Sequence, residues 1–219
     1  LSYNNYMNDF KEYNPEEQSL KDRHHLLLGS IAPRPIGFTT SIDIKGKINL
    51  APFSFHNAFS SNPPIIAISP AYSGKTGKAK DTLNNILSTK EFTLSIVTYK
   101  MTKQMNITSA NFNSNIDEYD MSGLSKYPSK LVAPPGVKES PIILECKLEK
   151  YIELSELPAG GNLILGRIIY IHAKSHYFDD KGYIDPTKID QIGRLGQNWY
   201  TRANQGLFEL PSPKHQPVG

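Results

Sequence analysis

Cysteine and long apolar runs are both scarce in this chain. Cys146 is the single cysteine among 219 residues, so an intramolecular disulfide is impossible and a cysteine-based zinc site is excluded. The longest sustained apolar runs span residues 64–69 and 162–173, well short of the ~18 residues that a membrane helix needs. Residues 1–7 lack the basic start and apolar centre of a signal peptide. We therefore expect a cytoplasmic protein that does not associate with a membrane.

An excess of charge of one sign is also missing. Lys and Arg number 24 against 21 Asp and Glu, which gives a net charge of +3, and no basic block interrupts the chain. Nucleic-acid-binding proteins usually concentrate positive charge on one face, so we expect no nucleic-acid partner. Sixteen prolines and fifteen glycines favour turns and short strands. The length predicts one domain over residues 1–219, with a core of about 23–210 between a short polar N-terminal extension and a C-terminal tail.

Hydrophobic patterning predicts a mainly β protein with short helices (α+β), built as a barrel or a sandwich. Residues 91–98 alternate apolar and polar side chains, which is typical of a strand with one buried face. Two long β-like segments flank Gly160 and Gly161 and predict a hairpin. The expected strands are 35–42, 48–51, 65–69, 91–98, 141–153 and 163–174, with a turn at 43–47. The expected helices are 23–29, 81–88 (behind a capping residue) and 103–110.

Residues 111–140 form a long stretch rich in Asn, Ser and Pro. A loop of that length inside a compact domain is usually functional. We expect it to act as a lid that shapes access to a site.

Two motifs suggest chemistry that their context does not support, and a third is missing. Gly74-Lys75-Thr76 ends like a nucleotide P-loop, but Ser69 stands where that motif needs its first glycine. His172 and His176 have the i, i+4 spacing of helical metal ligands, yet they lie in or after a strand, where four residues span roughly 13 Å. No Gly-x-Ser-x-Gly segment singles out a nucleophile. We expect neither a metal site nor a catalytic side chain.

Residues 49–61 are unusual for a surface connection. They combine small residues and hydroxyls with the rings of Phe53, Phe55, His56 and Phe59. Such a segment suits main-chain hydrogen bonds to the edge of a flat polar ligand with rings close by. A corner of a barrel core explains the pattern equally well, because Phe53, Phe55 and Phe59 alternate as buried strand residues do.

Lys80-Asp81-Thr82 begins the helix expected at 81–88, just after Lys75 and Lys78. A helix N-terminus offers unpaired N–H groups and a positive dipole end, so this is a candidate phosphate site. An ordinary capped helix after a solvated loop is the alternative. Residues 49–61, which we call the flat-ring segment because they could bind a flat ring, lie within about 30 residues of this phosphate site. Together the two features suggest a mononucleotide-like cofactor.

Five short motifs, in order, resemble the flavin reductase-like family. They are Pro-Arg-Pro-Ile-Gly at 33–37, Asn-Leu-Ala-Pro-Phe-Ser-Phe at 49–55, Asn-Pro-Pro at 62–64, Lys-Asp-Thr at 80–82 and Gly-Arg-Leu-Gly at 193–196. Each motif is weak alone, but their order and spacing match over nearly the whole chain. The resemblance implies an FMN-binding split β-barrel similar to flavoredoxin, and a homodimer with FMN in a groove at or near the subunit interface.

The resemblance also implies roles for individual residues. Residues 39–41, which close the first strand, would touch the flavin ring or its ribityl chain. Residues 51–55 would line the flavin ring, and residues 80–82 would bind its phosphate. The last motif would approach the cofactor or close the groove, from the same subunit or its partner. The cofactor-binding residues implied are Thr39, Thr40, Ser41, Ala51, Pro52, Phe53, Ser54, Phe55, Asn57, Lys80, Asp81, Thr82, Arg194 and Tyr200. The roles of His56 and Ser60 stay open.

The reaction implied is hydride transfer from NADH or NADPH to N5 of the flavin, which needs no acid or base side chain. One alternative is an FMN-binding electron-transfer protein that is fed by a protein donor. The other is a non-catalytic small-ligand or haem-binding barrel, which would use the histidines His24, His25, His56, His172 and His176.

Overall fold

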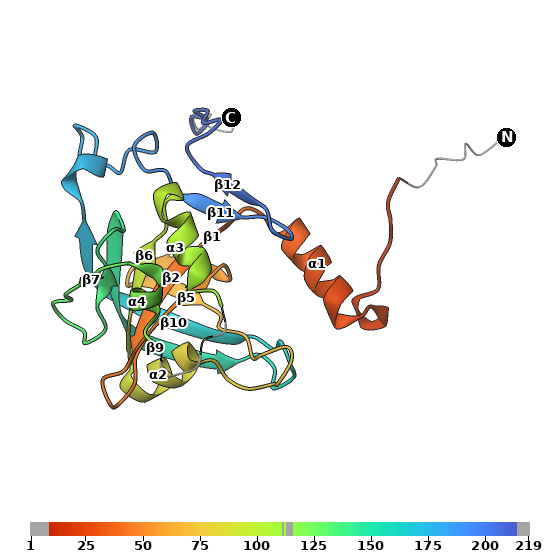
Figure 1. The fold of residues 1–219 in the computed structure, drawn as a ribbon. Coiled ribbons are helices and arrows are strands. Elements are labelled where there is room, and N and C mark those ends of the chain that lie inside the picture. The colour runs from red at the N-terminus through yellow and green to blue at the C-terminus, as the bar shows by residue number, and fades with distance from the viewer. Residues whose placement is uncertain (1–8, 111, 113–115, 214–219) are drawn as a thin grey trace.

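The computed structural model describes residues 9–110, 112 and 116–213, and most of its regular structure is β (Figure 1). Seven strands form one antiparallel sheet in the order β3-β2-β6-β9-β10-β5-β4. These are β2 (Gly37–Ile42), β3 (Ile48–Phe53), β4 (His56–Ser61), β5 (Pro64–Ile68), β6 (Glu91–Ile96), β9 (Ile142–Glu153) and β10 (Asn162–Ala173).

Smaller elements surround this sheet. A three-stranded sheet contains β1 (Arg34–Pro35), β11 (Ile192–Arg194) and β12 (Tyr200–Arg202), and a two-stranded one contains β7 (Lys126–Tyr127) and β8 (Gly136–Val137). The α-helices are α1 (Leu20–Ser30), α2 (Asp81–Thr89), α3 (Thr102–Ile107) and α4 (Glu118–Ser122). Short 3-10 helices are η1 (Pro15–Glu17), η2 (Tyr99–Met101) and η3 (Ser175–Tyr177). No helix of the described residues is long and apolar enough to cross a bilayer.

The two edge strands of the large sheet, β3 and β4, follow one another in the chain. Only two residues separate them, so the sheet must curl back on itself. The close approach occurs at Gly37, where an added Cβ would lie 3.0 Å from His56 Cγ and 2.7 Å from Leu94 Cδ1. A glycine in β2 therefore makes room for the imidazole that begins β4.

Several sequence predictions are confirmed. The long hairpin is β9 paired with β10 along its whole length. The turn at 43–47 is held by Asp43, whose carboxylate accepts the N–H groups of Lys45 and Lys47, and Gly46 has a φ of 86°. Helices form near all three expected places, as α1, α2 and α3.

β6 differs from its prediction because it is buried on both faces. Phe92 and Leu94 pack in a core cluster with α2, as the alternation predicts. Thr93 and Ser95, expected to face solvent, are buried as well. Thr93 donates a hydrogen bond to the carbonyl of Pro135, and Ser95 Oγ accepts one from the N–H of Val137. Polar side chains can occupy the second face because a later segment satisfies their hydroxyls.

That later segment is 116–140, the described part of the stretch at 111–140 that we expect to act as a lid. It contains α4, β7 and β8 and packs on the sheet. Tyr119 is only 1% exposed, and its hydroxyl lies 2.8 Å from Thr40 Oγ1. Val137 is fully buried. Residues 111 and 113–115 lie outside the described part of the chain.

Candidate functional site

The predicted ring and phosphate residues meet where β2, β3 and the start of α2 come together. Asn49 of β3 donates a hydrogen bond to Thr82 Oγ1 at 2.8 Å. Asn85, one turn further along α2, donates one to Ser41 Oγ of β2 at 3.1 Å. Two amide side chains therefore fix α2 against the strands. The sequence motifs assigned no role to either asparagine, although Asn49 is the first residue of the motif at 49–55.

Thr39, Thr40 and Ser41 do not offer side chains to a ligand in this structure. All three are fully buried, at 0% exposure. Successive strand residues point to opposite faces, so Thr40 faces Tyr119 while its two neighbours face α2. Because of this alternation the three side chains do not share one face, although the resemblance implies that all three residues touch one cofactor. Their hydroxyls bond within the protein.

The exposure of the flat-ring segment rises from residues 51–55 to β4. Ala51, Pro52, Ser54 and Phe55 are half-buried, and Phe53 is buried. Beyond them β4 is exposed: Phe59 is 64% exposed, and the exposed Asn57 accepts a hydrogen bond from the N–H of Ala58. The core-corner interpretation therefore holds for Phe53 and is wrong for Phe59. Residues 51–55 are the part that a ligand could reach while still lying against the barrel.

Lys80 connects this segment to α2. Its Nζ lies 5.7 Å from the centroid of the Phe53 ring, and partial burial of the ammonium lowers its pKa. Among the described residues, no carboxylate forms an ion pair with it. Lys80 is also the N-cap of α2 and makes no capping hydrogen bond through its side chain, so the capping residue that we expected is missing. The first N–H groups of α2 thus have no side-chain cap, beside an unpaired cation.

The basic loop before α2 is held in place. Tyr72 donates its N–H to the carbonyl of Gly160 at 2.9 Å, and a Cβ added at Gly74 would lie 3.8 Å from Ala159 Cβ. The loop therefore rests on the tip of the β9–β10 hairpin. This contact fixes the approach to Lys80.

Asp81 faces a different environment from Lys80. It lines a cavity of about 240 Å³ together with Asp43, Lys47, Ile48, Asn49, Asn85, Ile116 and Glu118. Burial raises the pKa of Glu118, and the charges of Asp117 and Asp81 raise it further. Three carboxylates and one ammonium group, that of Lys47, line this cavity, so its net negative charge disfavours a phosphate. A phosphate fits the Lys80 side of α2 and not the Asp81 side.

Arg194 and Tyr200 lie elsewhere, on the β11–β12 hairpin. Figure 1 shows this hairpin at the end of the molecule away from α2. Arg194 lies over the Tyr200 ring, 4.8 Å from its centroid, and bonds to the Tyr200 hydroxyl. Within one chain these residues are therefore not part of the β3–α2 site.

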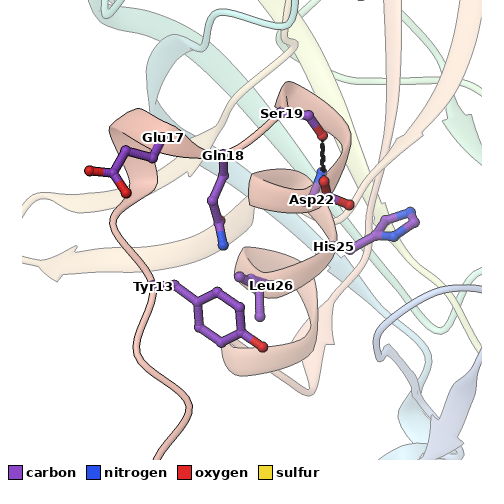
Figure 2. A pocket seen from close by; sticks show the side chains of 7 residues that line it. All are labelled: Tyr13, Glu17, Gln18, Ser19, Asp22, His25 and Leu26. Atoms are coloured by element: carbon purple, nitrogen blue, oxygen red, sulfur yellow. Dashed lines mark hydrogen bonds between the residues drawn. The ribbon is translucent and has the colours of Figure 1, made fainter.

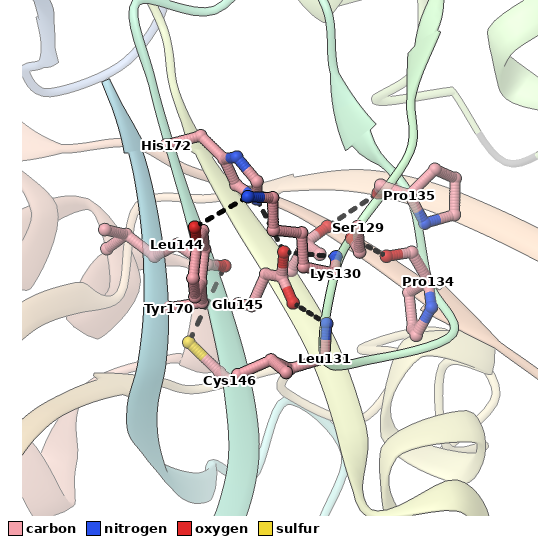
Figure 3. A network of polar contacts seen from close by, with 11 residues as sticks. Ser129, Lys130, Leu131, Pro134, Pro135, Leu144, Glu145, Cys146, Tyr170 and His172 are labelled. Atoms are coloured by element: carbon pink, nitrogen blue, oxygen red, sulfur yellow. Dashed lines mark hydrogen bonds and ion pairs between the residues drawn. The ribbon is translucent and has the colours of Figure 1, made fainter.

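The histidines do not form a ligand set. His56 Nδ1 donates to the carbonyl of Ala67 at 3.0 Å, and burial lowers the pKa of His56. His172 donates to Glu145, in the network that Figure 3 shows. Among the described residues, no group of three or more His, Cys, Asp and Glu side chains has a geometry that holds a metal ion.

A larger cavity, of about 470 Å³, lies on the N-terminal arm (Figure 2). Residues of α1, η1 and the preceding chain line it: Tyr13, Glu17, Gln18, Ser19, Asp22, His25 and Leu26. It shares no residue with the β3–α2 site.

Comparison with known proteins decides the family. The model of the flavin reductase like domain matches residues 28–188. The chain belongs to the flavin reductase-like family. It is a flavoprotein with a split β-barrel, as the five motifs predicted.

Three similar proteins illustrate this membership. The crystal structure of nitrilotriacetate monooxygenase component B from Bacillus cereus is 35% identical, with a TM-score of 0.86, over 93% of this chain and all of that one. The 2-nitrobenzoate 2-nitroreductase NbaA of Pseudomonas fluorescens is 27% identical, with a TM-score of 0.82, over 95% and 100%. Uncharacterized protein YwrF of Bacillus subtilis (strain 168) is 33% identical over 196 residues, covering 88% of this chain and 95% of that protein.

The β3–α2 site of this flavin reductase-like chain fits the parts of a flavin mononucleotide. Half-buried main chain at 51–55 can face a flat heterocycle, and Lys80 with the uncapped start of α2 can face an anion. Within one chain, the β3–α2 site brings together fewer residues than the motifs implied, and the acidic cavity beyond Asp81 favours an anion on the Lys80 side.

Proposed function

We propose that this chain is an FMN-dependent oxidoreductase that takes hydride from NADH or NADPH. The observation that supports it best is Lys80, an unpaired cation lying against Phe53 at a helix start without a side-chain cap. One such anion site suits the single phosphate of FMN better than the pyrophosphate of FAD. When bound, FMN supplies the hydride acceptor and electron carrier.

The chain's own residues bind and orient the cofactor in this proposal. Main-chain groups of Ala51–Phe55 hydrogen-bond the polar edge of the ring, and Lys80 neutralises the phosphate. Asn49 and Asn85 act as positioning residues, because they fix α2 against the strands that carry the ring segment. Thr39, Thr40, Ser41 and Thr82 support this geometry from the interior, where their side chains are buried.

A homodimer belongs to the same proposal, since the family resemblance implies one and places the cofactor at or near the subunit interface. The printed name of the Bacillus cereus relative, a monooxygenase component, favours a reaction in which electrons pass on to a separate protein. An FMN-binding electron-transfer protein is therefore the second candidate function.

The test is an anaerobic titration of the apoprotein with FMN by visible absorbance, followed in the same cuvette by NADH and then NADPH. Saturable binding with bleaching by either nucleotide supports the reductase and identifies its donor. Binding that only dithionite bleaches supports the electron-transfer protein. No binding contradicts both.

Lys80→Ala tests the phosphate site in the same assay. Loss of a charge-assisted contact should weaken FMN binding by roughly 1.5–3 kcal/mol. Lys100→Ala, which removes an exposed lysine of η2, is the matched control and should leave the affinity unchanged. Equal affinities of the two variants would place the phosphate elsewhere.

A further inference from the structure

Two arginines face each other across the small sheet. Arg34 of β1 and Arg194 of β11 are register partners in an antiparallel ladder, and Tyr200 of β12 is the register partner of Arg194. Directly opposite residues point to the same face, so the three side chains form one row. Like charges in this arrangement repel each other, and the repulsion from Arg194 adds to burial in lowering the pKa of Arg34.

Arg34 is almost completely buried without a counter-ion. It is 5% exposed, and its guanidinium donates only to main-chain carbonyls, those of Leu28, Ile31 and Leu195. Its Nε is buried and has no hydrogen-bond partner. No carboxylate of the described residues forms an ion pair with Arg34 or Arg194. An uncompensated buried cation is costly, and an anion would remove that cost.

The surroundings of Arg194 suit such an anion. Arg194 donates to Gln197 and Tyr200, and its remaining N–H groups have no acceptor among the described residues. His24 of α1 adds to the positive field: burial lowers the pKa of His24, and the charges of His25, Arg34 and Arg194 lower it further. Trp199, at the tip of the same hairpin, is 71% exposed.

We propose that the row Arg34–Arg194–Tyr200 is a second anion site, which receives a phosphate group of a nucleotide. Guanidinium forks match phosphate geometry, and Arg194 is held in a fixed orientation by the Tyr200 ring. The exposed indole of Trp199 offers a stacking surface for a base beside the charges. The choice of a nucleotide over bare phosphate rests on the proposed function, and the anion site itself does not.

Two nucleotides could supply this phosphate, the pyridine nucleotide and the flavin. The hairpin lies away from the β3–α2 site within one chain, so one chain has two separate places for phosphate. A dinucleotide carries phosphate far from its reacting ring. The pyridine nucleotide is therefore the source that the geometry favours.

The only tryptophan of the chain makes the test direct. The fluorescence of Trp199 in the apoprotein is followed during titration with 2′,5′-ADP, with ADP and with uncharged adenosine. We expect a saturable change with both phosphate compounds and at least tenfold weaker binding of adenosine, which offers the base alone. The affinity should fall as salt is raised, because the site is electrostatic.

Arg194→Gln should weaken 2′,5′-ADP binding at least tenfold. Arg167→Gln is the matched control, since Arg167 is an exposed arginine of β10 that pairs with Glu149. Circular dichroism checks that both variants keep their secondary structure. No response of the unaltered protein, or equal binding by the two variants, would overturn the proposal.

A competition identifies the source of the phosphate. The titration is repeated with saturating FMN, and bound 2′,5′-ADP is measured by equilibrium dialysis. Binding that persists supports the pyridine nucleotide, whereas displacement supports the anion site and assigns it to the flavin phosphate. The visible titration of FMN by the apoprotein is a separate measurement, so failure of this site and failure of the proposed function give different results.

Discussion

Gly37 shows how one residue allows the barrel to close. It pairs with Phe53 on one side and Ile96 on the other, and the His56 ring occupies the space where its side chain would be. A methyl group there would meet two neighbours at 3.0 Å or less: Leu94, which is fully buried, and His56, which is hydrogen-bonded to Ala67. The glycine of the first motif is therefore required by packing, independently of any ligand.

Gly37→Ala should lower the free energy of unfolding by about 1–3 kcal/mol, the usual cost of overpacking a core. Gly29→Ala is the control, because a Cβ on Gly29 of α1 meets nothing within 4 Å. That change should leave stability the same or raise it by up to about 1 kcal/mol. Urea denaturation of both variants measures the difference. Equal stabilities would mean that His56 and Leu94 move aside at little cost.

At the scale of elements, Glu145 joins the 116–140 segment to the β9–β10 hairpin. Its Oε1 accepts hydrogen bonds from His172 Nε2 at 2.5 Å and from the N–H of Lys130 at 2.7 Å, and its Oε2 accepts the N–H of Leu131 at 2.6 Å. Figure 3 shows these groups converging on one carboxylate. Burial alone would raise the pKa of Glu145, but the hydrogen bonds outweigh it and hold the pKa below its usual value.

Glu145→Gln should therefore destabilise the fold by roughly 1.5–3 kcal/mol at pH 7, because the N–H groups of Lys130 and Leu131 and the His172 ring lose a charged acceptor. Glu149→Gln on the same strand removes only an exposed ion pair and should cost at most about 1 kcal/mol. The folded-state pKa of Glu145 is depressed, so its stabilisation is complete above the unfolded value of 4.5 and is lost as the pH falls through the lower folded value. Chemical denaturation at pH 7 and in steps below pH 4.5 measures this. A difference between the variants that does not shrink in acid would contradict it.

The sequence predicted those elements whose formation depends on residues that are close together in the chain. The β9–β10 hairpin and the 43–47 turn follow from alternation, glycine and an Asp side chain within a few residues. The structured 116–140 segment could not be predicted, because Tyr119 is buried against Thr40, which lies far away in the sequence. The same limit applies to the site. The motifs identified Lys80, but only the folded chain shows that Asp81 faces an acidic cavity.

At the scale of the whole molecule, α1 stands outside the barrel. None of its residues is buried, and Leu20, Leu26 and Leu27 are exposed (Figure 1). An isolated helix of eleven residues is marginal in water. At its C-terminal end Arg34 donates hydrogen bonds to the carbonyls of Leu28 and Ile31, and a Cβ added at Gly196 would lie 3.2 Å from Gly29 Cα. A second copy of the chain in the proposed homodimer would cover the exposed leucines.

Hydrogen exchange measured at several protein concentrations tests this arrangement. We expect the amides of α1 to exchange much faster than those of β2 and β6 in dilute solution, because few buried contacts oppose their opening. If a second copy covers α1, its protection rises with concentration in step with dimer formation measured by sedimentation. The 43–47 turn, which is exposed and locally held, is the internal control and should not change. Protection of α1 that stays low in the fully dimeric sample would mean that the dimer forms through another face, and that Arg34 holds the helix unaided.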